Sequence, residues 1–177
     1  MLDIHHKRQG QMEEDFVYYY TQSIHKMKPL LKDDHLKLEV IQTLKYLTDK
    51  GLIQLYAFVI MHNHIHLLWK MLKIGRESPA ASFSKYTGRQ FKIYLEGKGL
   101  LGQYQSEKKD RNFQFWKRDP LAIPISSEKI FFQRLDYIHY NPVKAGLCAI
   151  PEEYRWGSAV FYLGGKDEFE MLTRYPE

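Results

Sequence analysis

The feature that most constrains the fold is a pair of apolar segments separated by a two-residue polar turn. Residues 52–61 read LIQLYAFVIM and residues 64–71 read HIHLLWKM, with His62 and Asn63 between them. Both segments have the length and the β-branched and aromatic content of buried strands, and asparagine tolerates the left-handed backbone of a tight turn. The sequence therefore predicts an antiparallel β-hairpin over residues 52–71.

Strand-like and helix-like segments alternate on either side of this hairpin. The stretch FVYYYTQSI at 16–24 predicts a strand, and residues 113–125 predict an extended edge segment because Pro120 and Pro124 interrupt it. Helical spacing of apolar residues predicts three helices. The first spans residues 33–50, with Asp33 or Asp34 as the cap and Gly51 as the stop. The second opens at Ser78-Pro79, and the third spans residues 126–141 with Ser126 or Ser127 as the cap.

The last part of this pattern, NPVKAGL at 141–147, predicts one further helical turn with Pro142 at its first position and Gly146 as its stop. The order β-α-β-β-α-β-α favours an α+β fold, a ferredoxin-like sandwich. It would have a central four-stranded antiparallel sheet with helices packed on one face, and the hairpin at the centre of the sheet. We find no linker, so residues 1–177 are predicted to form a single domain.

Composition excludes several classes of protein. Cys148 is the single cysteine, which excludes an intrachain disulfide and a cysteine-rich zinc module. The longest uninterrupted apolar run, residues 55–61, is too short to span a bilayer, and residues 1–15 lack the apolar core of a signal peptide. We therefore expect a soluble, cytoplasmic protein with no membrane partner. The net charge of +5 is compatible with a polyanionic partner but does not by itself indicate one.

Two histidines of the hairpin are candidate metal ligands. Side chains alternate across a strand, so His64 and His66 project to the same side, roughly 7 Å apart along the strand. Two neutral imidazoles at this spacing can converge on one cation. Alternatively, they hydrogen-bond to backbone or water on an exposed sheet face.

The helix at 126–141 carries a polar side that could complete such a site. Gln133, Tyr137 and Asn141 recur at a spacing of four residues, opposite the apolar residues of the same helix. The Asn141 amide oxygen could be a third ligand, and the Tyr137 hydroxyl would then lie beside the ion. The other interpretation is that Asn141, which precedes Pro142, caps a new helical turn.

Several of these segments together resemble a known family. The hairpin VIMHNHIHLL, the stretch FQFWKRD, the helix DYIHYNPVKAGL and the closing EEYRWGSA resemble the REP-associated tyrosine transposases, a branch of the single-tyrosine HUH transposases. The resemblance extends from about residue 55 to residue 159. The chain departs from the family at His62, where proline is usual. This change falls in the turn, so we expect it to alter the rigidity of the hairpin, or to offer a competing imidazole.

The resemblance implies a metal-dependent enzyme that cleaves and rejoins single-stranded DNA near hairpins formed by palindromic repeats. It implies that Tyr137 is the nucleophile, forming a 5′-phosphotyrosine intermediate, and that His64, His66 and Asn141 bind a divalent metal, Mg²⁺ or Mn²⁺. Imidazole ligands favour Mn²⁺ over Mg²⁺. The implied partner is single-stranded or hairpin DNA, and the protein would be a monomer or a homodimer.

Basic residues interleaved with aromatic ones are the candidate DNA contacts. Lys85, Arg89 and Lys92 form a stripe on the second predicted helix, which is either a DNA contact or a solvated face. Trp116 is either a stacking surface or a core side chain. The other predicted contacts are Lys108, Lys109, Arg111, Lys117 and Arg118.

Three other functions remain open at this point. A hairpin-binding protein that has lost catalysis would bind DNA without nicking it. A phosphodiesterase that uses water would form no covalent adduct through Tyr137. A metal-free interaction module would be unaffected by the loss of His64 and His66.

Overall fold

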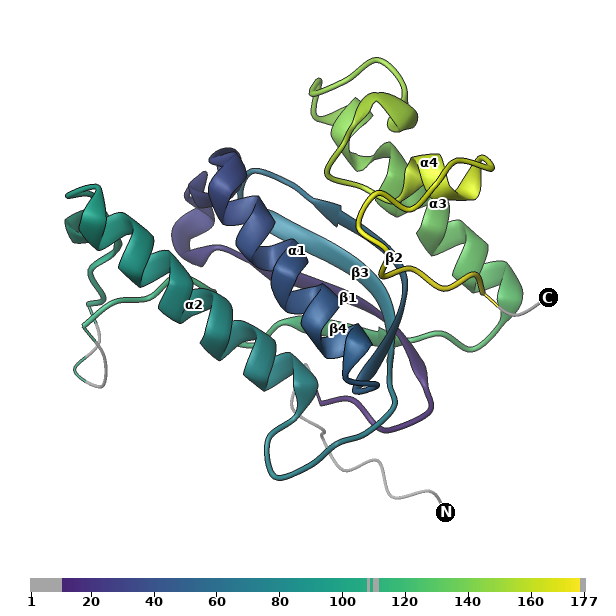
Figure 1. The fold of residues 1–177 in the computed structure, drawn as a ribbon, viewed down its shortest axis with the longest axis horizontal. Coiled ribbons are helices and arrows are strands. Elements are labelled where there is room, and N and C mark those ends of the chain that lie inside the picture. The colour runs from purple at the N-terminus through teal and green to yellow at the C-terminus, as the bar shows by residue number, and fades with distance from the viewer. Residues whose placement is uncertain (1–10, 108, 110–111, 176–177) are drawn as a thin grey trace.

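A computed structural model of the chain describes residues 11–107, 109 and 112–175, and its longer elements match the predicted ones (Figure 1). The strands are β1 (Val17–Ser23), β2 (Ile53–Ile60), β3 (His64–Met71) and β4 (Leu121–Pro124). The α-helices are α1 (Asp34–Asp49), α2 (Pro79–Gly97), α3 (Glu128–Lys144) and the short α4 (Ala159–Tyr162). Single 3₁₀ turns lie at His25–Met27, Leu30–Lys32, Leu101–Tyr104 and Pro151–Glu153.

The four strands form one antiparallel sheet in the order β2-β3-β1-β4, which confirms the predicted α+β class and ferredoxin-like sheet. The hairpin is not wholly central, because β3 is an inner strand whereas β2 lies at the edge. Segments near the C-terminus cover that edge: Ile60 N–H donates to the Trp156 carbonyl, and Leu55 bridges to Leu172. The exposed backbone groups of β2 thus gain partners within the chain.

Helices cover both faces of the sheet, which corrects the prediction that all helices pack on one face. On one face, Trp69 of β3 contacts Phe83 of α2, and α1 lies beside α2 (Figure 1). His66, whose side chain points to the opposite face, contacts Tyr137 of α3. The apolar stripe of α3 was predicted correctly, but an apolar stripe is compatible with either face of a sheet.

The end of α3 differs from the prediction. The helix continues through Pro142 to Lys144, and Gly146 follows it with φ +68°. Asn141 therefore lies inside a helix, and the interpretation that it caps a new turn is wrong. Its side-chain Nδ2 donates to the Tyr137 carbonyl at 3.0 Å.

The predicted edge segment forms a strand over only four residues, which pair with β1. Further upstream, Trp116 makes a single bridge to Ile24. The short strand is consistent with the prolines at 120 and 124, which cannot donate to a sheet. Across the described residues, no helix combines the length and apolar character that crossing a membrane requires.

Candidate active site

The histidines of β3 lie side by side on the sheet face that α3 covers. They project to the same side, as the alternation of a strand predicts, and their ring centroids are 4.8 Å apart. His66 is almost fully buried, with 4% of its surface exposed, and His64 is half-buried. The alternative of two exposed rings on an open sheet face therefore does not describe His66.

Each imidazole uses its Nδ1 atom to bond a neighbouring group. His64 Nδ1 is 2.7 Å from Asn63 Oδ1, and because an amide oxygen only accepts, Nδ1 carries the proton. His66 Nδ1 is 2.7 Å from the Thr21 hydroxyl and 2.9 Å from the Tyr19 hydroxyl. Partners at Nδ1 fix the orientation of a ring and leave Nε2 as the free nitrogen, which is the usual arrangement around histidine metal ligands.

Electrostatics keep both rings neutral at pH 7. Burial lowers the pKa of His64. Burial, together with the repulsion that His66 would feel from a protonated His64, lowers the pKa of His66 to about 3. A neutral imidazole is the form that binds a metal. The pair is therefore ready to bind a cation without first releasing protons.

Tyr137 approaches this pair from α3. Its ring centroid is 5.6 Å from that of His66 and 6.1 Å from that of Tyr19, and 40% of the residue is exposed. A phenol that is partly open to solvent and in contact with a buried imidazole can reach a bound substrate. The structure therefore brings together Tyr137 and His66, which are 71 positions apart in the sequence.

The nature of a third metal ligand follows from which side chains are available. Within the described residues, no group of three His, Cys, Asp or Glu side chains could hold a metal. A third ligand from the chain would then have to be of another kind, such as the amide oxygen of Asn141, since its Nδ2 is used by the Tyr137 carbonyl. Two imidazole nitrogens and one amide oxygen are donors that suit Mn²⁺, and less well Mg²⁺.

His62, in the turn before β3, lies near charged residues of α1 and of the turn before it. Its pKa is lowered by burial and by Lys37 and Lys32, while Asp34 opposes the shift. These charges belong to the start of α1 and the turn before it, on the other face of the sheet. That His62 offers a competing imidazole stays a prediction.

Sequence reasoning missed four residues around the site. Tyr19 and Thr21 bond His66, the Arg134 guanidinium lies 4.8 Å from the centroid of the Tyr19 ring, and Lys144 Nζ lies 5.2 Å from that of Tyr137. Alternation along β1 puts Tyr19 and Thr21 on one face, but which face it is depends on how β1 pairs with β3.

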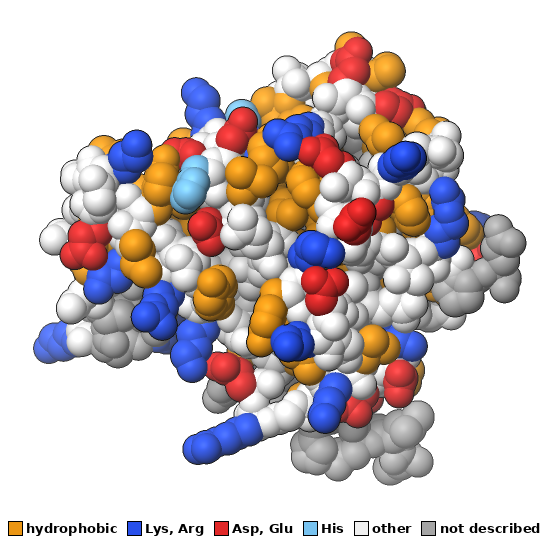
Figure 2. Space-filling model, in the orientation of Figure 1, with side chains coloured by type: hydrophobic (Ala, Val, Ile, Leu, Met, Phe, Trp, Pro, Cys, Tyr) orange, Lys and Arg blue, Asp and Glu red, His pale blue; other side chains and the backbone are white. Residues whose placement is uncertain are grey.

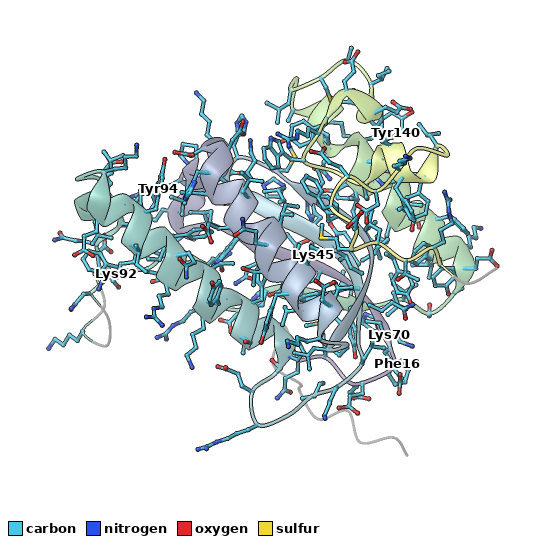
Figure 3. The ribbon with its side chains drawn as sticks, in the orientation of Figure 1. Phe16, Lys45, Lys70, Lys92, Tyr94 and Tyr140 are labelled. Atoms are coloured by element: carbon cyan, nitrogen blue, oxygen red, sulfur yellow. The ribbon has the colours of Figure 1, made fainter. Side chains whose placement is uncertain are left out.

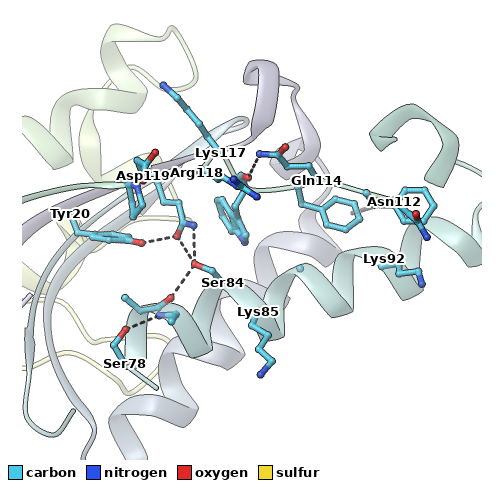
Figure 4. Close-up of a pocket in the computed structure, with 18 residues that line it drawn as sticks. Tyr20, Ser78, Ser84, Lys85, Lys92, Asn112, Gln114, Lys117, Arg118 and Asp119 are labelled. Atoms are coloured by element: carbon cyan, nitrogen blue, oxygen red, sulfur yellow. Dashed lines mark hydrogen bonds between the residues drawn. The ribbon is translucent and has the colours of Figure 1, made fainter. Parts of the chain in front are cut away.

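The predicted DNA contacts mostly line a groove on the other face of the sheet (Figure 4). The groove has a volume of about 770 Å³. One side is α2, with Lys85 and Lys92, and the other is the segment 112–120, with Lys117 and Arg118. Residues from two basic clusters far apart in the sequence thus line one hollow. Figure 2 shows Lys and Arg side chains spread over the visible face among Asp and Glu, with several at its lower left.

The other predicted contacts are a buried residue at the base of the groove and residues outside it. Trp116 is 8% exposed, packs against Phe83 and Phe91, and donates its Nε1 to Thr87, so the prediction that it is a stacking surface is wrong. Its indole is a core side chain that closes the base of the groove. Arg89 and Lys109 are exposed but do not line the groove, and Lys108 and Arg111 lie outside the described residues.

The chain is similar in structure to a solved protein. It matches a structure described as a REP-associated tyrosine transposase bound to a REP hairpin with a TM-score of 0.63, over 98% of this chain and 100% of that chain. The chain has the fold of a REP-associated tyrosine transposase. The two sequences are 15% identical, so the likeness is one of fold, and it confirms the resemblance drawn from the hairpin and the Tyr137 helix at that level.

A second, weaker structural match is also described as a transposase. A candidate transposase from Deinococcus radiodurans matches with a TM-score of 0.43 and 16% identity, over 76% of this chain and 95% of that one. No protein-family model matches the sequence, and neither does any curated protein. The transposase fold is therefore recognised from its structure and from the short motifs of the hairpin and α3.

Proposed function

We propose that this protein is a transposase that cleaves and rejoins single-stranded DNA next to a hairpin, with Tyr137 as the nucleophile. The observation that supports this most directly is the contact between the Tyr137 ring and His66, at 5.6 Å. A water-activating hydrolase has no need of a phenol at this position. The transposase fold gives the arrangement its context.

In the proposed reaction the phenolic oxygen of Tyr137 attacks a phosphorus atom of the DNA backbone. The bond from phosphorus to the 3′ oxygen breaks, and a bond from phosphorus to the tyrosine oxygen forms. The phenol proton passes to solvent, and the departing 3′ oxygen takes up a proton. Because one ester replaces another, the phosphotyrosine retains the energy for a 3′-hydroxyl to attack it and rejoin the strand.

His64, His66 and Asn141 are the residues that would hold Mg²⁺ or Mn²⁺. When bound, such an ion polarises the phosphate and helps to align it for attack. The protein residues contribute the rest of the alignment: Thr21 and Tyr19 hold the His66 ring through Nδ1, and Asn63 holds the His64 ring in the same way.

DNA binding is proposed to extend from this site to the groove between α2 and residues 112–120. Lys85, Lys92 and Lys117 would contact backbone phosphates there. The solved structure with this fold carries a REP hairpin, which makes a hairpin the first substrate to test. Since Tyr137 contacts His66 of its own chain, we propose that a monomer is sufficient for cleavage.

The test uses a hairpin oligonucleotide with a single-stranded extension, labelled at its 3′ end, in the presence of Mn²⁺. The label should move with the protein on a denaturing gel, because the fragment on the 3′ side of the break remains on Tyr137. Tyr137→Phe should abolish this adduct and keep hairpin binding. The control is Tyr140→Phe, one turn further along α3 and 52% exposed, which should still form the adduct. Binding without an adduct in the unaltered protein would instead identify an inactive hairpin-binding protein.

A further inference from the structure

Arg134 is a cation beside the proposed nucleophile that has no assigned role. It lies on α3, three residues before Tyr137, and its guanidinium carbon is 4.8 Å from the centroid of the Tyr19 ring. Its Nε atom is buried and has no hydrogen-bond partner among the described residues. A buried charged donor without a partner is costly, so its presence calls for a physical explanation.

The way Arg134 is held indicates the kind of ligand that would satisfy it. A guanidinium over an aromatic ring uses its flat face, and its N–H donors point outward in the plane of the group. These donors match the spacing of two oxygens on a phosphate or carboxylate. Within the described part of the chain no carboxylate forms an ion pair with Arg134, although Asp136 lines the same hollow.

The position of Arg134 relative to Tyr137 narrows the choice to the scissile phosphate. Both residues line a surface hollow of about 370 Å³ along α3, together with Lys144. Both also contact Tyr19: the guanidinium lies over the Tyr19 ring, and the Tyr137 ring meets it edge-on at 6.1 Å. An anion bound by Arg134 would therefore lie next to the phenol.

We propose that Arg134 binds a non-bridging oxygen of the phosphate that Tyr137 attacks, and that it neutralises the negative charge that accumulates there in the transition state. This rests on the proposed function of Tyr137. In that role Arg134 is a catalytic residue, because it touches the reacting group. The stacking on Tyr19 links its position to His66, since the Tyr19 hydroxyl also bonds His66 Nδ1 at 2.9 Å.

The test compares two substrates that differ only at the scissile position, one with a normal phosphodiester and one with an uncharged methylphosphonate. With the normal substrate, Arg134→Ala should slow adduct formation in a single turnover by about 100-fold or more, a typical loss for a donor that stabilises a transition-state oxyanion. Hairpin affinity should change by less than about threefold, because the other basic side chains still hold the DNA backbone. Arg134→Lys should be slowed less than Arg134→Ala, because it keeps the charge and loses the planar fork.

With the methylphosphonate, the difference between Arg134→Ala and the unaltered protein should fall to less than about tenfold, because the charge that Arg134 would neutralise is absent. A purely structural role, such as support of the Tyr19 ring, would give the same loss with both substrates and would overturn the assignment. Lys129→Ala, an exposed change on the same helix and outside the hollow, is the matched control and should behave as the unaltered protein.

Two further outcomes separate this inference from the proposed function. If the unaltered protein forms an adduct and Arg134→Ala forms it at the same rate, the role of Arg134 is overturned and that of Tyr137 stands. If the unaltered protein forms no adduct with either substrate, both are overturned. Thermal unfolding of Arg134→Ala and Arg134→Lys shows whether each variant is folded under the assay conditions.

Discussion

Thr21 and His66 lie directly opposite each other on β1 and β3, and the Thr21 hydroxyl is 2.7 Å from His66 Nδ1. The pair connects β1, for which the sequence indicated no functional residue, to β3, which carries the two histidines. The hydroxyl is one of two that hold the imidazole, the other being that of Tyr19 on the same strand. The orientation of His66 is therefore set by β1 and not by β3 alone.

Replacing Thr21 by valine should weaken metal binding while preserving the fold. Valine has the shape of threonine and is favoured in strands, but it removes the hydroxyl that orients His66. We expect Mn²⁺ affinity to fall by about tenfold, at the low end for loss of such a partner because Tyr19 remains. Isothermal titration with Mn²⁺ measures this. Thr43→Val on α1 serves as a control because its hydroxyl donates to the Glu39 carbonyl of its own helix, away from His66. An unchanged affinity in Thr21→Val would contradict the role of the pair.

The groove lysines should contribute to DNA affinity through counterion release. Lys92 on α2 and Lys117 on the opposite side of the groove both line it. Removing one lysine that neutralises a phosphate should reduce the slope of log affinity against log salt by about 0.7 for a single strand. The double change Lys92→Ala with Lys117→Ala should therefore lower the slope by about 1.4. Fluorescence anisotropy at several salt concentrations measures the slope.

Lys45→Ala is the control for this experiment. Lys45 lies on α1, pairs with Asp49 and is half-buried, and Figure 3 shows it away from Lys92. The same view places Lys92 and Tyr140 on opposite sides of the molecule, so changes in the groove should not disturb the proposed active site directly. If Lys45→Ala lowers the slope of log affinity against log salt as much as the groove variants do, a specific role for the groove is contradicted.

Gly88→Ala should stabilise the protein. Gly88 is inside α2, and a Cβ atom there would lie 3.8 Å from Phe115 Cδ2, an ordinary contact. Alanine is favoured over glycine in a helix by about 1 kcal/mol, so we expect the free energy of unfolding to rise by about 0.5–1 kcal/mol. Urea unfolding measures the change. Gly146→Ala should have the opposite effect, because Gly146 has φ +68°, a conformation that alanine rarely adopts.

Stability should decline at alkaline pH, partly because of Tyr162. Burial raises the pKa of Tyr162 to about 12, and its hydroxyl donates to the Tyr56 carbonyl at 2.9 Å. Since the pKa in the unfolded chain is about 10, the contribution of the neutral phenol is complete below pH 10 and is lost between about pH 10 and 12. The loss is at most about 1.4 kcal/mol per pH unit.

The variant Tyr162→Phe isolates this contribution. It should be less stable than the unaltered protein at about pH 8 by about 1 kcal/mol, since it lacks the hydrogen bond. Above about pH 10 the two unfolding free energies should converge. The unaltered protein loses the contribution of the Tyr162 phenol there, whereas the variant has no phenol at this position to lose. Parallel curves up to about pH 12 would contradict the raised pKa.

Much of the local structure could be predicted from the sequence. Asp33 and Ser127 cap α1 and α3 through bonds from His35 N–H and Ile130 N–H, and Gly51 follows α1 with φ +63°. Each of these features depends on residues within one turn of each other. Pro142 shows the limit, because a proline that usually begins a helix is here accommodated inside one.

The candidate site could be predicted only in part. His64 and His66 were identified from alternation along a single strand, and Tyr137 and Asn141 from a polar stripe together with the family resemblance. Tyr19, Thr21 and Arg134 escaped notice because their importance depends on strand pairing and on which face of the sheet α3 covers. For Trp116 the sequence left a stacking surface and a core side chain open, and the packing of α2 over its indole decides for the core.

The sequence by itself determined the first strand, the hairpin, the three long helices and the shared direction of two imidazoles, because each follows from the periodicity of neighbouring residues. The tertiary structure alone decided that α3 crosses to the face opposite α1 and α2, that Tyr137 meets His66, and that two basic segments line one groove. These outcomes depend on contacts between residues far apart in the chain. Periodicity tells which side of an element is buried, but only the packing of the whole chain selects the surface against which it is buried.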